Sequence, residues 1–305
     1  MVDPSLVLGF GDAPGHLLRR AQQIHTAVWA REVGDIVTGP QYATLVAVAG
    51  WPNLDQKRAG ELASLDKSTV GGVVKRLESK GWISRATSPV DARRRVLVLT
   101  DRAYERLPSV TAAAARVQES LLAPLPVDEA AGFVRLLRAV ALADAPAMGQ
   151  APRSSPALEL SSTPGYLIRR AQQVHFAIWT TVFDGELTST QYAVLVAAAG
   201  SDSVDQSQIG NLASLDSSSV ADIVTRLEAR GWLTRRKDPD DGRRMIVDMT
   251  GPATTAVAHL TRSVQDVQHR LLSPLTVEQA RQFMMWMQRL TGTARNDADR
   301  VPATA

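Results

Sequence analysis

The chain of 305 residues contains no cysteine. Disulfide bonds, thiolate metal sites, cysteine nucleophiles and thiol redox sensors are therefore excluded. Aromatic residues make up only 5% of the chain. The formal net charge is only +3, so the total charge alone does not indicate a nucleic-acid partner, and the positions of the charges must decide. No apolar run is long enough to cross a bilayer, and residues 1–14 lack the pattern of a secretory signal. We expect a globular, cytoplasmic protein with no membrane partner.

Signals of enzymatic chemistry are lacking as well. The five histidines show no metal-ligand spacing, and the sequence holds neither a glycine-rich phosphate loop nor a nucleophile motif. We therefore expect no enzyme activity, no cofactor and no metal site.

What the sequence does contain is one long internal repeat. Residues 14–100 match residues 164–250 at a constant offset of 150 and without a gap. QYATLVAVAG pairs with QYAVLVAAAG, and LASLDKSTV with LASLDSSSV. The stretch between the copies is rich in Ala, Pro and Ser, as linkers are. The predicted organisation is a first domain at 1–144, a linker at 145–163, a second domain at 164–294 and a flexible tail at 295–305.

The centre of each copy predicts a helix-turn-helix followed by a hairpin. In the first copy Asp66 stands where a helix N-cap is wanted, and apolar residues at helical spacing predict a helix from Lys67 to Lys80. The hydrophobic period then changes from 3.6 to 2, which predicts short strands at 82–85 and 96–99. The predicted fold class is mainly α with small β wings (α+β), as two tandem winged helix-turn-helix domains.

The outer face of the second helix in this motif carries short polar and basic side chains. Such a helix enters a major groove without clashing, and arginines on a projecting loop suit a narrow minor groove. A polar helix face or a basic loop alone is ordinary solvated surface, but their order and spacing together favour binding to double-stranded DNA. The candidate DNA-binding residues are Lys67, Ser68, Thr69, Gly72, Lys75, Arg76, Arg93, Arg94 and Arg95 in the first copy, and Ser217, Ser218, Ser219, Asp222, Thr225, Arg226, Arg243 and Arg244 in the second.

The two predicted recognition helices differ in charge. Residues 66–80 hold four basic and two acidic residues, a formal +2, whereas residues 216–230 hold two basic and three acidic residues, a formal −1. Where the first helix offers Gly72 and Lys75 to a groove, the second offers Asp222 and Thr225. A carboxylate there accepts from a cytosine amino group and repels phosphates. We predict a non-palindromic operator, to which the second copy contributes less affinity.

The first and last helices of each copy indicate that the two copies pair with each other. The helix over residues 15–32 has two adjoining apolar stripes, more than one neighbour needs, and apolar helices close both copies. We expect an intramolecular pseudo-dimer. The alternative is that the terminal helices only cover their own domain. Whether two chains also form a homodimer stays open. A solution mass near 32.9 kDa would indicate a single chain, and twice that mass would indicate a homodimer.

The central segments, LASLDKSTVGGVVKRLESKGW and LASLDSSSVADIVTRLEARGW with the hairpins that follow them, resemble the MarR family of bacterial transcriptional regulators. The second copy keeps the family's wing pattern in residues 238–244, whereas the first, residues 88–94, lacks two of the acidic positions. The resemblance implies a triangular dimer with terminal helices as its base and two winged helices in successive major grooves. It also implies release of DNA when a small molecule binds between base and winged helix.

The opening GHLLRRAQQIHTAVW is similar to the branch of this family that controls the catabolism of aromatic acids. That likeness implies an arginine and a histidine on the first helix that hold the ligand's carboxylate and ring substituent. Arg20 and Arg170 are alternatives for the arginine, and packing of histidine and tryptophan between the copies is the alternative to a pocket. The candidate ligand-binding residues are Arg19, His25 and Trp29 with Arg169, His175 and Trp179.

The predicted function is a ligand-responsive DNA-binding transcriptional regulator, a repressor released by a small aromatic carboxylic compound and acting as a single-chain pseudo-dimer. The alternative is an architectural or constitutive DNA-binding protein without a ligand, which keeps its DNA in the presence of aromatic acids. Activation in place of repression also stays open.

Overall fold

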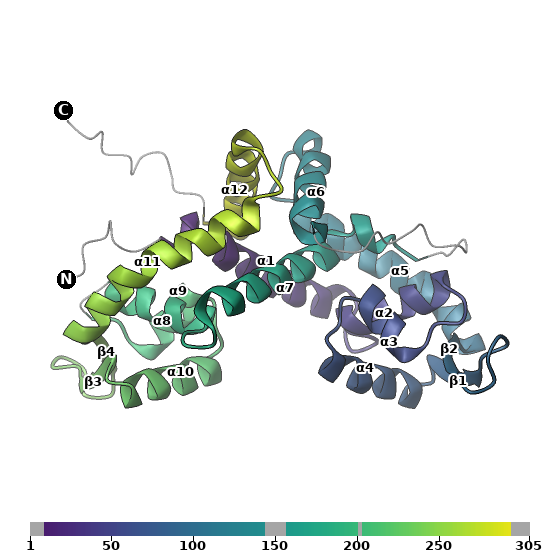
Figure 1. The fold of residues 1–305 in the computed structure, drawn as a ribbon, viewed down its shortest axis with the longest axis horizontal. Coiled ribbons are helices and arrows are strands. Elements are labelled where there is room, and N and C mark those ends of the chain that lie inside the picture. Colours follow the sequence, from purple (N-terminus) through teal and green to yellow (C-terminus); the bar gives the residue numbers. More distant parts are fainter. Residues whose placement is uncertain (1–8, 144–156, 201–202, 294–305) are drawn as a thin grey trace. The chain divides into compact units, whose positions relative to one another are not determined.

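The computed structural model describes residues 9–143, 157–200 and 203–293. By their internal contacts the residues divide into two compact units (Figure 1). Of the described residues, the wing-1 unit comprises 22–143 and 157–170, and the wing-2 unit comprises 9–21, 171–200 and 203–293. The predicted tail at 295–305 and the predicted linker up to residue 156 lie outside the described residues.

The wing-1 unit is mainly helical and contains one small antiparallel sheet (Figure 1). Its elements are α1 (Pro14–Glu32) from residue 22 on, α2 (Gly39–Gly50), α3 (Gln56–Leu62), α4 (Lys67–Ser79), β1 (Ile83–Thr87), β2 (Arg95–Leu99), α5 (Asp101–Leu122), α6 (Val127–Leu142), the 3-10 turn η3 (Leu160–Ser162) and the start of α7 (Pro164–Phe183).

The wing-2 unit repeats this order, which confirms the predicted fold class of two winged helix-turn-helix domains with small β wings. Across the described ranges, no helix combines the length and apolar character that crossing a bilayer requires. The elements of the wing-2 unit are η2 (Phe10–Asp12), α1 up to residue 21, α7 from residue 171, α8 (Ser189–Ala199), α9 (Gln206–Ala213), α10 (Ser217–Ala229), β3 (Leu233–Lys237), β4 (Met245–Met249), α11 (Gly251–Leu272) and α12 (Val277–Thr291).

Polar side chains fix the starts of the helices in the helix-turn-helix. Asp55 accepts a hydrogen bond from a backbone N–H in the first turn of α3, and Asp66 does the same for two N–H groups at the start of α4. The predicted end of α4 is one residue late, because Lys80 is the C-cap and Gly81 follows it in the left-handed region at φ 69°. Asp205 and Asp216 cap α9 and α10 in the same way.

The core of the wing-1 unit lies beneath α4. Val70, Val73, Val74 and Leu77 are buried, as the predicted apolar stripe requires, and α4 packs against α2, α3 and β1. The face of α4 opposite this stripe is thereby left to solvent.

The hairpin after α4 is longer than the sequence predicted. β1 pairs with β2 from Ile83 opposite Leu99 to Thr87 opposite Arg95. Backbone hydrogen bonding continues into the loop, where the N–H of Ser88 donates to the carbonyl of Arg94 at 2.9 Å, and this extends both strands toward the tip. The N–H of Leu97 donates to the carbonyl of Leu54 at 2.7 Å, so the hairpin is tied to the segment before α3.

The last part of the predicted linker is ordered. Residues 157–163 contain η3, in which Leu160 is 4% exposed and packs against α6, and the hydroxyl of Thr163 donates to the carbonyl of Glu159 at 2.7 Å. An equivalent turn, η2, stands 150 residues earlier.

Candidate DNA-binding surface and ligand cavity

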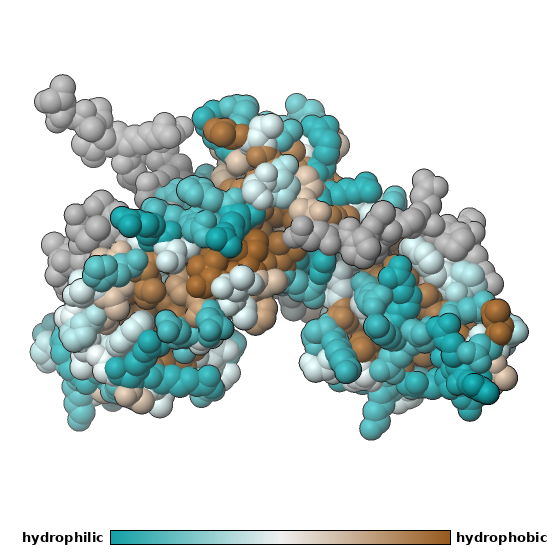
Figure 2. Space-filling view, in the orientation of Figure 1, coloured by the Kyte–Doolittle hydropathy of each residue, from teal (hydrophilic) through white to brown (hydrophobic). Residues whose placement is uncertain are grey.

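The predicted DNA-binding residues of α4 share the solvent side of that helix, where Figure 2 shows a mostly hydrophilic surface. The outer side of α10 is arranged in the same way. In α4, Lys67, Ser68, Lys75 and Arg76 are exposed, with Thr69 and Gly72 partly exposed; in α10, Ser217, Ser218, Asp222, Thr225 and Arg226 are exposed, with Ser219 partly exposed.

The hydroxyl groups at the start of α4 are held by the N-cap. Ser68 Oγ donates to Asp66 Oδ1, and Thr69 Oγ1 donates to Asp66 Oδ2 at 2.6 Å. These two bonds, with those from the backbone, hold the pKa of Asp66 well below its ordinary value, so the cap stays ionised. Because both hydroxyl hydrogens are engaged, the oxygens face outward as acceptors. Asp216 orients Ser218 and Ser219 in the same way.

The middle of α4 differs from that of α10. The guanidinium of Arg76 lies over Gly72, since a Cβ added to this glycine would stand 3.5 Å from Arg76 Nη1. Lys75 makes no side-chain hydrogen bond or ion pair with any residue that the structure describes, and its ammonium is free to reach a base edge or phosphate. In α10 the glycine position is taken by Asp222. The charge difference predicted from sequence therefore lies on the exposed face.

In the first wing the three predicted arginines have different surroundings. Arg94 Nη2 lies 2.5 Å from Asp55 Oδ2, so this side chain joins the loop to the cap of α3. Arg95 Nη1 donates to the hydroxyl of Thr87 at 3.1 Å. Arg93 is exposed and, among the described residues, its guanidinium has no partner. The loop thus presents Arg93, while Arg94 positions the loop.

In the second wing Arg244 is bound still more tightly. Its guanidinium contacts Asp205 at 2.8 Å and Asp238 at 3.1 Å and donates to the carbonyl of Ser203 and the amide oxygen of Gln208. The hydrogen bond to Asp205 is the largest cause of the raised pKa of Arg244. The sequence grouped Arg243 with Arg244 as DNA contacts, and did not reveal that Arg244 is already paired with two carboxylates.

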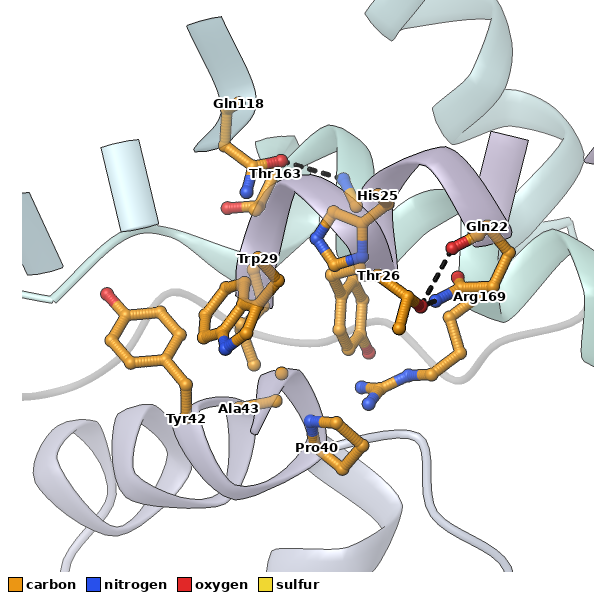
Figure 3. A pocket seen from close by; sticks show the side chains of 14 residues that line it. Gln22, His25, Thr26, Trp29, Pro40, Tyr42, Ala43, Gln118, Thr163 and Arg169 are labelled. Atoms are coloured by element: carbon orange, nitrogen blue, oxygen red, sulfur yellow. Dashed lines mark hydrogen bonds between the residues drawn. The ribbon is translucent and has the colours of Figure 1, made fainter. Parts of the chain in front are cut away.

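A cavity of about 290 Å³ lies within the wing-1 unit (Figure 3). It brings together His25 and Trp29 of α1 with Arg169 of α7. The predicted grouping of Arg19 with His25 is thereby replaced, since Arg19 lines a cavity of the wing-2 unit with His175 and Trp179. The cavity in the wing-1 unit is lined by Gln22, His25, Thr26, Trp29, Gly39, Pro40, Tyr42, Ala43, Gln118, Leu160, Thr163, Gly165, Tyr166 and Arg169.

The alternative arginine Arg20 has another contact. Its Nε donates to the carbonyl of Thr291 at 2.7 Å, and it lines neither described cavity. Arg170 is likewise absent from both linings.

The polar groups of the larger cavity are a cation and a neutral ring. Burial lowers the pKa of His25 to about 4, with the positive charge of Arg169 acting in the same direction, so the imidazole is neutral at pH 7. Burial lowers the pKa of Arg169 to about 10, and the guanidinium stays charged. Arg169 Nε and His25 Nδ1 are buried without a hydrogen-bond partner among the described residues, and no acidic side chain lines the cavity. The site therefore has a charge that lacks a counter-ion.

The rings of the cavity are fixed in place. Trp29 Nε1 donates to the carbonyl of Val37 at 2.7 Å, and the indole lies 5.7 Å from the rings of both His25 and Tyr42, centroid to centroid. His25 and Trp29 are each 7% exposed. They are thus both packed in the core and part of the cavity wall.

A glycine permits the close contact between α7 and His25. A Cβ added to Gly165 would stand 2.1 Å from His25 Nε2, and one added to Gly15 would stand 2.2 Å from His175 Nε2. Both distances are too short for any side chain at these positions. His25 therefore requires a glycine at position 165, and His175 requires one at position 15. This close contact is a physical reason for a glycine at both positions.

The cavity of the wing-1 unit is joined to its helix-turn-helix. Arg169 Nη2 donates to the carbonyl of Ala63 at 2.6 Å. The hydroxyl of Tyr166 donates to the carbonyl of Leu62 at 3.1 Å and accepts from Ser64 Oγ at 2.7 Å. Leu62 is the last residue of α3, and Ala63 and Ser64 lie in the turn before α4. Tyr166 was missed by sequence reasoning, because the other copy has His16 at this place.

The corresponding cavity in the wing-2 unit measures only about 30 Å³. Burial lowers the pKa of His175 to about 4, and that of His16 to about 3. The ring of Phe10 lies 4.5 Å from the ring of His16, centroid to centroid. The two cavities thus use matching positions but differ about tenfold in volume.

The chain is similar to several known proteins. The model of the MarR family matches residues 37–94 and 187–245. Transcriptional regulator HosA of Escherichia coli O111:H- is 35% identical over 123 residues, which are 40% of this chain and 90% of that protein. HTH-type transcriptional repressor NicR of Pseudomonas putida is 29% identical over 41% of this chain and 79% of that protein. The structure of PcaV from Streptomyces coelicolor in complex with its natural ligand has 34% identity and a TM-score of 0.42, and covers 46% of this chain and 99% of that one.

Proposed function

Because the chain belongs to the MarR family of transcriptional regulators, we propose that it is a DNA-binding repressor that a small aromatic carboxylate releases from its operator. The observation that carries this proposal is the charged Arg169 without a counter-ion in an aromatic-walled cavity. Repression is the action named for the similar protein NicR. The family comprises regulators, and we expect no enzymatic activity of this one.

The chemistry of the cavity supports a ligand with one flat ring. A volume of about 290 Å³ is at the lower end of ligand pockets, which range over roughly 300–1,000 Å³. A carboxylate would pair with Arg169 and relieve the cost of its burial. The ring would then lie against Trp29, and a ring hydroxyl would reach Nδ1 of His25, which is buried without a partner among the described residues.

Release of DNA follows from a competition for Arg169. In the structure this side chain donates to the carbonyl of Ala63, in the turn between α3 and α4. A carboxylate is a stronger acceptor for a guanidinium than a neutral carbonyl. Ligand binding would draw Arg169 away from the turn, and α4 would lose a restraint on the position from which it reads DNA.

We also propose that the two copies form one pseudo-dimer within a chain. The proposed copies of the repeat are residues 1–144 and 164–294. Each compact unit combines most of one copy with the start of the first helix of the other copy. The N–H of Gly165 donates to Gln118 in the wing-1 unit at 2.8 Å, and the N–H of Gly15 donates to Gln268 in the wing-2 unit at 3.2 Å. The exchange is reciprocal, as between the subunits of a two-fold dimer. A solution mass of 32.9 kDa is expected.

The test is DNA binding with and without a ligand of defined chemistry. The full-length protein first selects an operator duplex from a pool of random sequences. This duplex is then titrated with the protein in the absence and in the presence of 4-hydroxybenzoate. We expect a tenfold or greater loss of affinity with 4-hydroxybenzoate, and none with its methyl ester, which has no charge for Arg169. Retention of DNA with 4-hydroxybenzoate and with other monocyclic aromatic carboxylates would favour a constitutive DNA-binding protein and overturn the proposal.

A further inference from the structure

We infer that only the cavity of the wing-1 unit holds an effector, so that one ligand per chain controls the first winged helix and leaves the second without ligand control. This inference rests on the proposed function, and it specifies which of the two matching sites binds the ligand. Three features within the units support it: cavity size, the residues that set this size, and the contacts from cavity to turn.

The cavity of the wing-2 unit is too small for a ring. Its volume of about 30 Å³ is far below the roughly 300–1,000 Å³ of pockets that bind small molecules. In the wing-1 unit the matching space is about 290 Å³. Both cavities hold the same arginine, histidine and tryptophan, so the difference does not come from the residues that would recognise the ligand.

The closure has a cause in the residues that differ between the copies. Phe10 stands where the wing-1 unit has Leu160, and Val264 stands where it has the smaller Ala114. Phe10 and Val264 both line the small cavity. Phe10 also packs on the core of the wing-2 unit and on the ring of His16, so it is held in the space that a ligand ring would need.

The link from cavity to turn is also confined to the wing-1 unit. There, Tyr166 and Arg169 make three hydrogen bonds to residues 62–64. In the wing-2 unit the matching residues are His16 and Arg19, and neither makes a side-chain hydrogen bond with any residue that the structure describes. A ligand in this second cavity would have no such bond to displace.

The charge of the helices makes this arrangement effective. The controlled helix, α4, belongs to the segment with a formal +2, whereas the segment of α10 has a formal −1. Phosphate contacts supply most of the affinity of such helices for DNA. A single ligand would therefore act on the winged helix that contributes more of the DNA-binding energy. The second winged helix would continue to protect the DNA at its own half-site.

The first test is the stoichiometry of 4-hydroxybenzoate binding to the full-length chain by isothermal titration calorimetry. We expect one site per chain. Two equivalent sites would overturn the inference and leave the proposed function intact. Absence of binding by every monocyclic aromatic carboxylate tried would remove both. His25→Ala should weaken binding at least tenfold, and the matched variant His175→Ala should leave the affinity unchanged; equal losses in both would contradict the assignment.

A second test opens the closed cavity. The variant Phe10→Leu, His16→Tyr, Val264→Ala gives the wing-2 unit the residues of the wing-1 unit at these three positions, and its expected stoichiometry is two. The reverse change, Leu160→Phe, should abolish binding. Circular dichroism and thermal melting establish that both variants are folded. A folded triple variant that still binds one ligand, or a Leu160→Phe variant that binds as the parent does, would overturn the inference.

Discussion

Replacement of Gly165 by alanine tests the contact on which the larger cavity depends. The new Cβ would stand 2.1 Å from His25 Nε2, far inside contact distance, so either the imidazole or the start of α7 must move. Overpacking of this kind costs about 1–3 kcal/mol. The gain in helix propensity from glycine to alanine, about 1 kcal/mol at most, offsets only part of this cost.

The matched control is Gly251→Ala. Gly251 is also in the first turn of a helix, and nothing lies within 4 Å of an added Cβ. We expect this variant to be as stable as the parent or up to about 1 kcal/mol more stable. Urea unfolding of the full-length chain, followed by tryptophan fluorescence and circular dichroism, measures both variants. Gly165→Ala should unfold at lower urea concentration than Gly251→Ala.

A double-mutant cycle separates the clash from other effects of the substitution. If the imidazole is the group that the new methyl strikes, Gly165→Ala should cost less in a His25→Ala background than in the parent, by about the energy of the clash. Equal costs in both backgrounds, or a Gly165→Ala protein as stable as the control, would refute the close packing of α7 on His25 and with it the shape of the cavity.

Four further predictions concern DNA contacts and stability. Arg93→Ala should reduce the slope of log affinity against log salt by about 1, whereas Arg94→Ala, already paired with Asp55, should change the slope less; titrations at several salt concentrations decide this. Lys75→Ala should alter base preference at one half-site, and selection from random duplexes detects it; a uniform loss of affinity would mark a phosphate contact. Tyr166→Phe should lower the free energy of unfolding by about 1 kcal/mol through loss of its two hydrogen bonds. Because burial lowers the pKa of His25 to about 4, the unfolded state binds protons first, and stability should fall as the pH drops from about 6.5 toward 4; His25→Ala should flatten that part of the profile.

The helix-turn-helix and its caps could be predicted from sequence because their causes are local. Asp66 precedes the helix that it caps, and the apolar stripe of α4 recurs at the helical period. The wing followed from the change to a period of 2 and from its turn residues. Such features require only neighbouring residues, so one copy of the repeat contained all the information that was needed.

The composition of the cavities could not be predicted in this way. The family resemblance implied that Arg19 and His25, on the same helix, act together, but the structure groups His25 with Arg169 and Arg19 with His175. Since both copies carry the same residues, sequence alone cannot distinguish grouping within a copy from exchange between copies. The pairing of Arg94 with Asp55 was hidden for another reason: the two residues are 39 positions apart, and only the folded domain brings the wing loop next to the start of α3.

Fusion of the two copies explains how matching sites can come to differ. In a dimer of identical chains every substitution appears twice, so a residue that closes one cavity closes both. In a fused chain the two positions are separate, and Phe10 can fill one cavity while Leu160 leaves the other open. The same freedom separates Gly72 from Asp222 on the DNA-facing helices. Both differences favour the first winged helix, since the more basic helix is the one joined to the larger cavity by Arg169. Under the proposed function, ligand control and the larger share of the DNA affinity would therefore reside in the same compact unit, where one binding event would have the greatest effect on the complex.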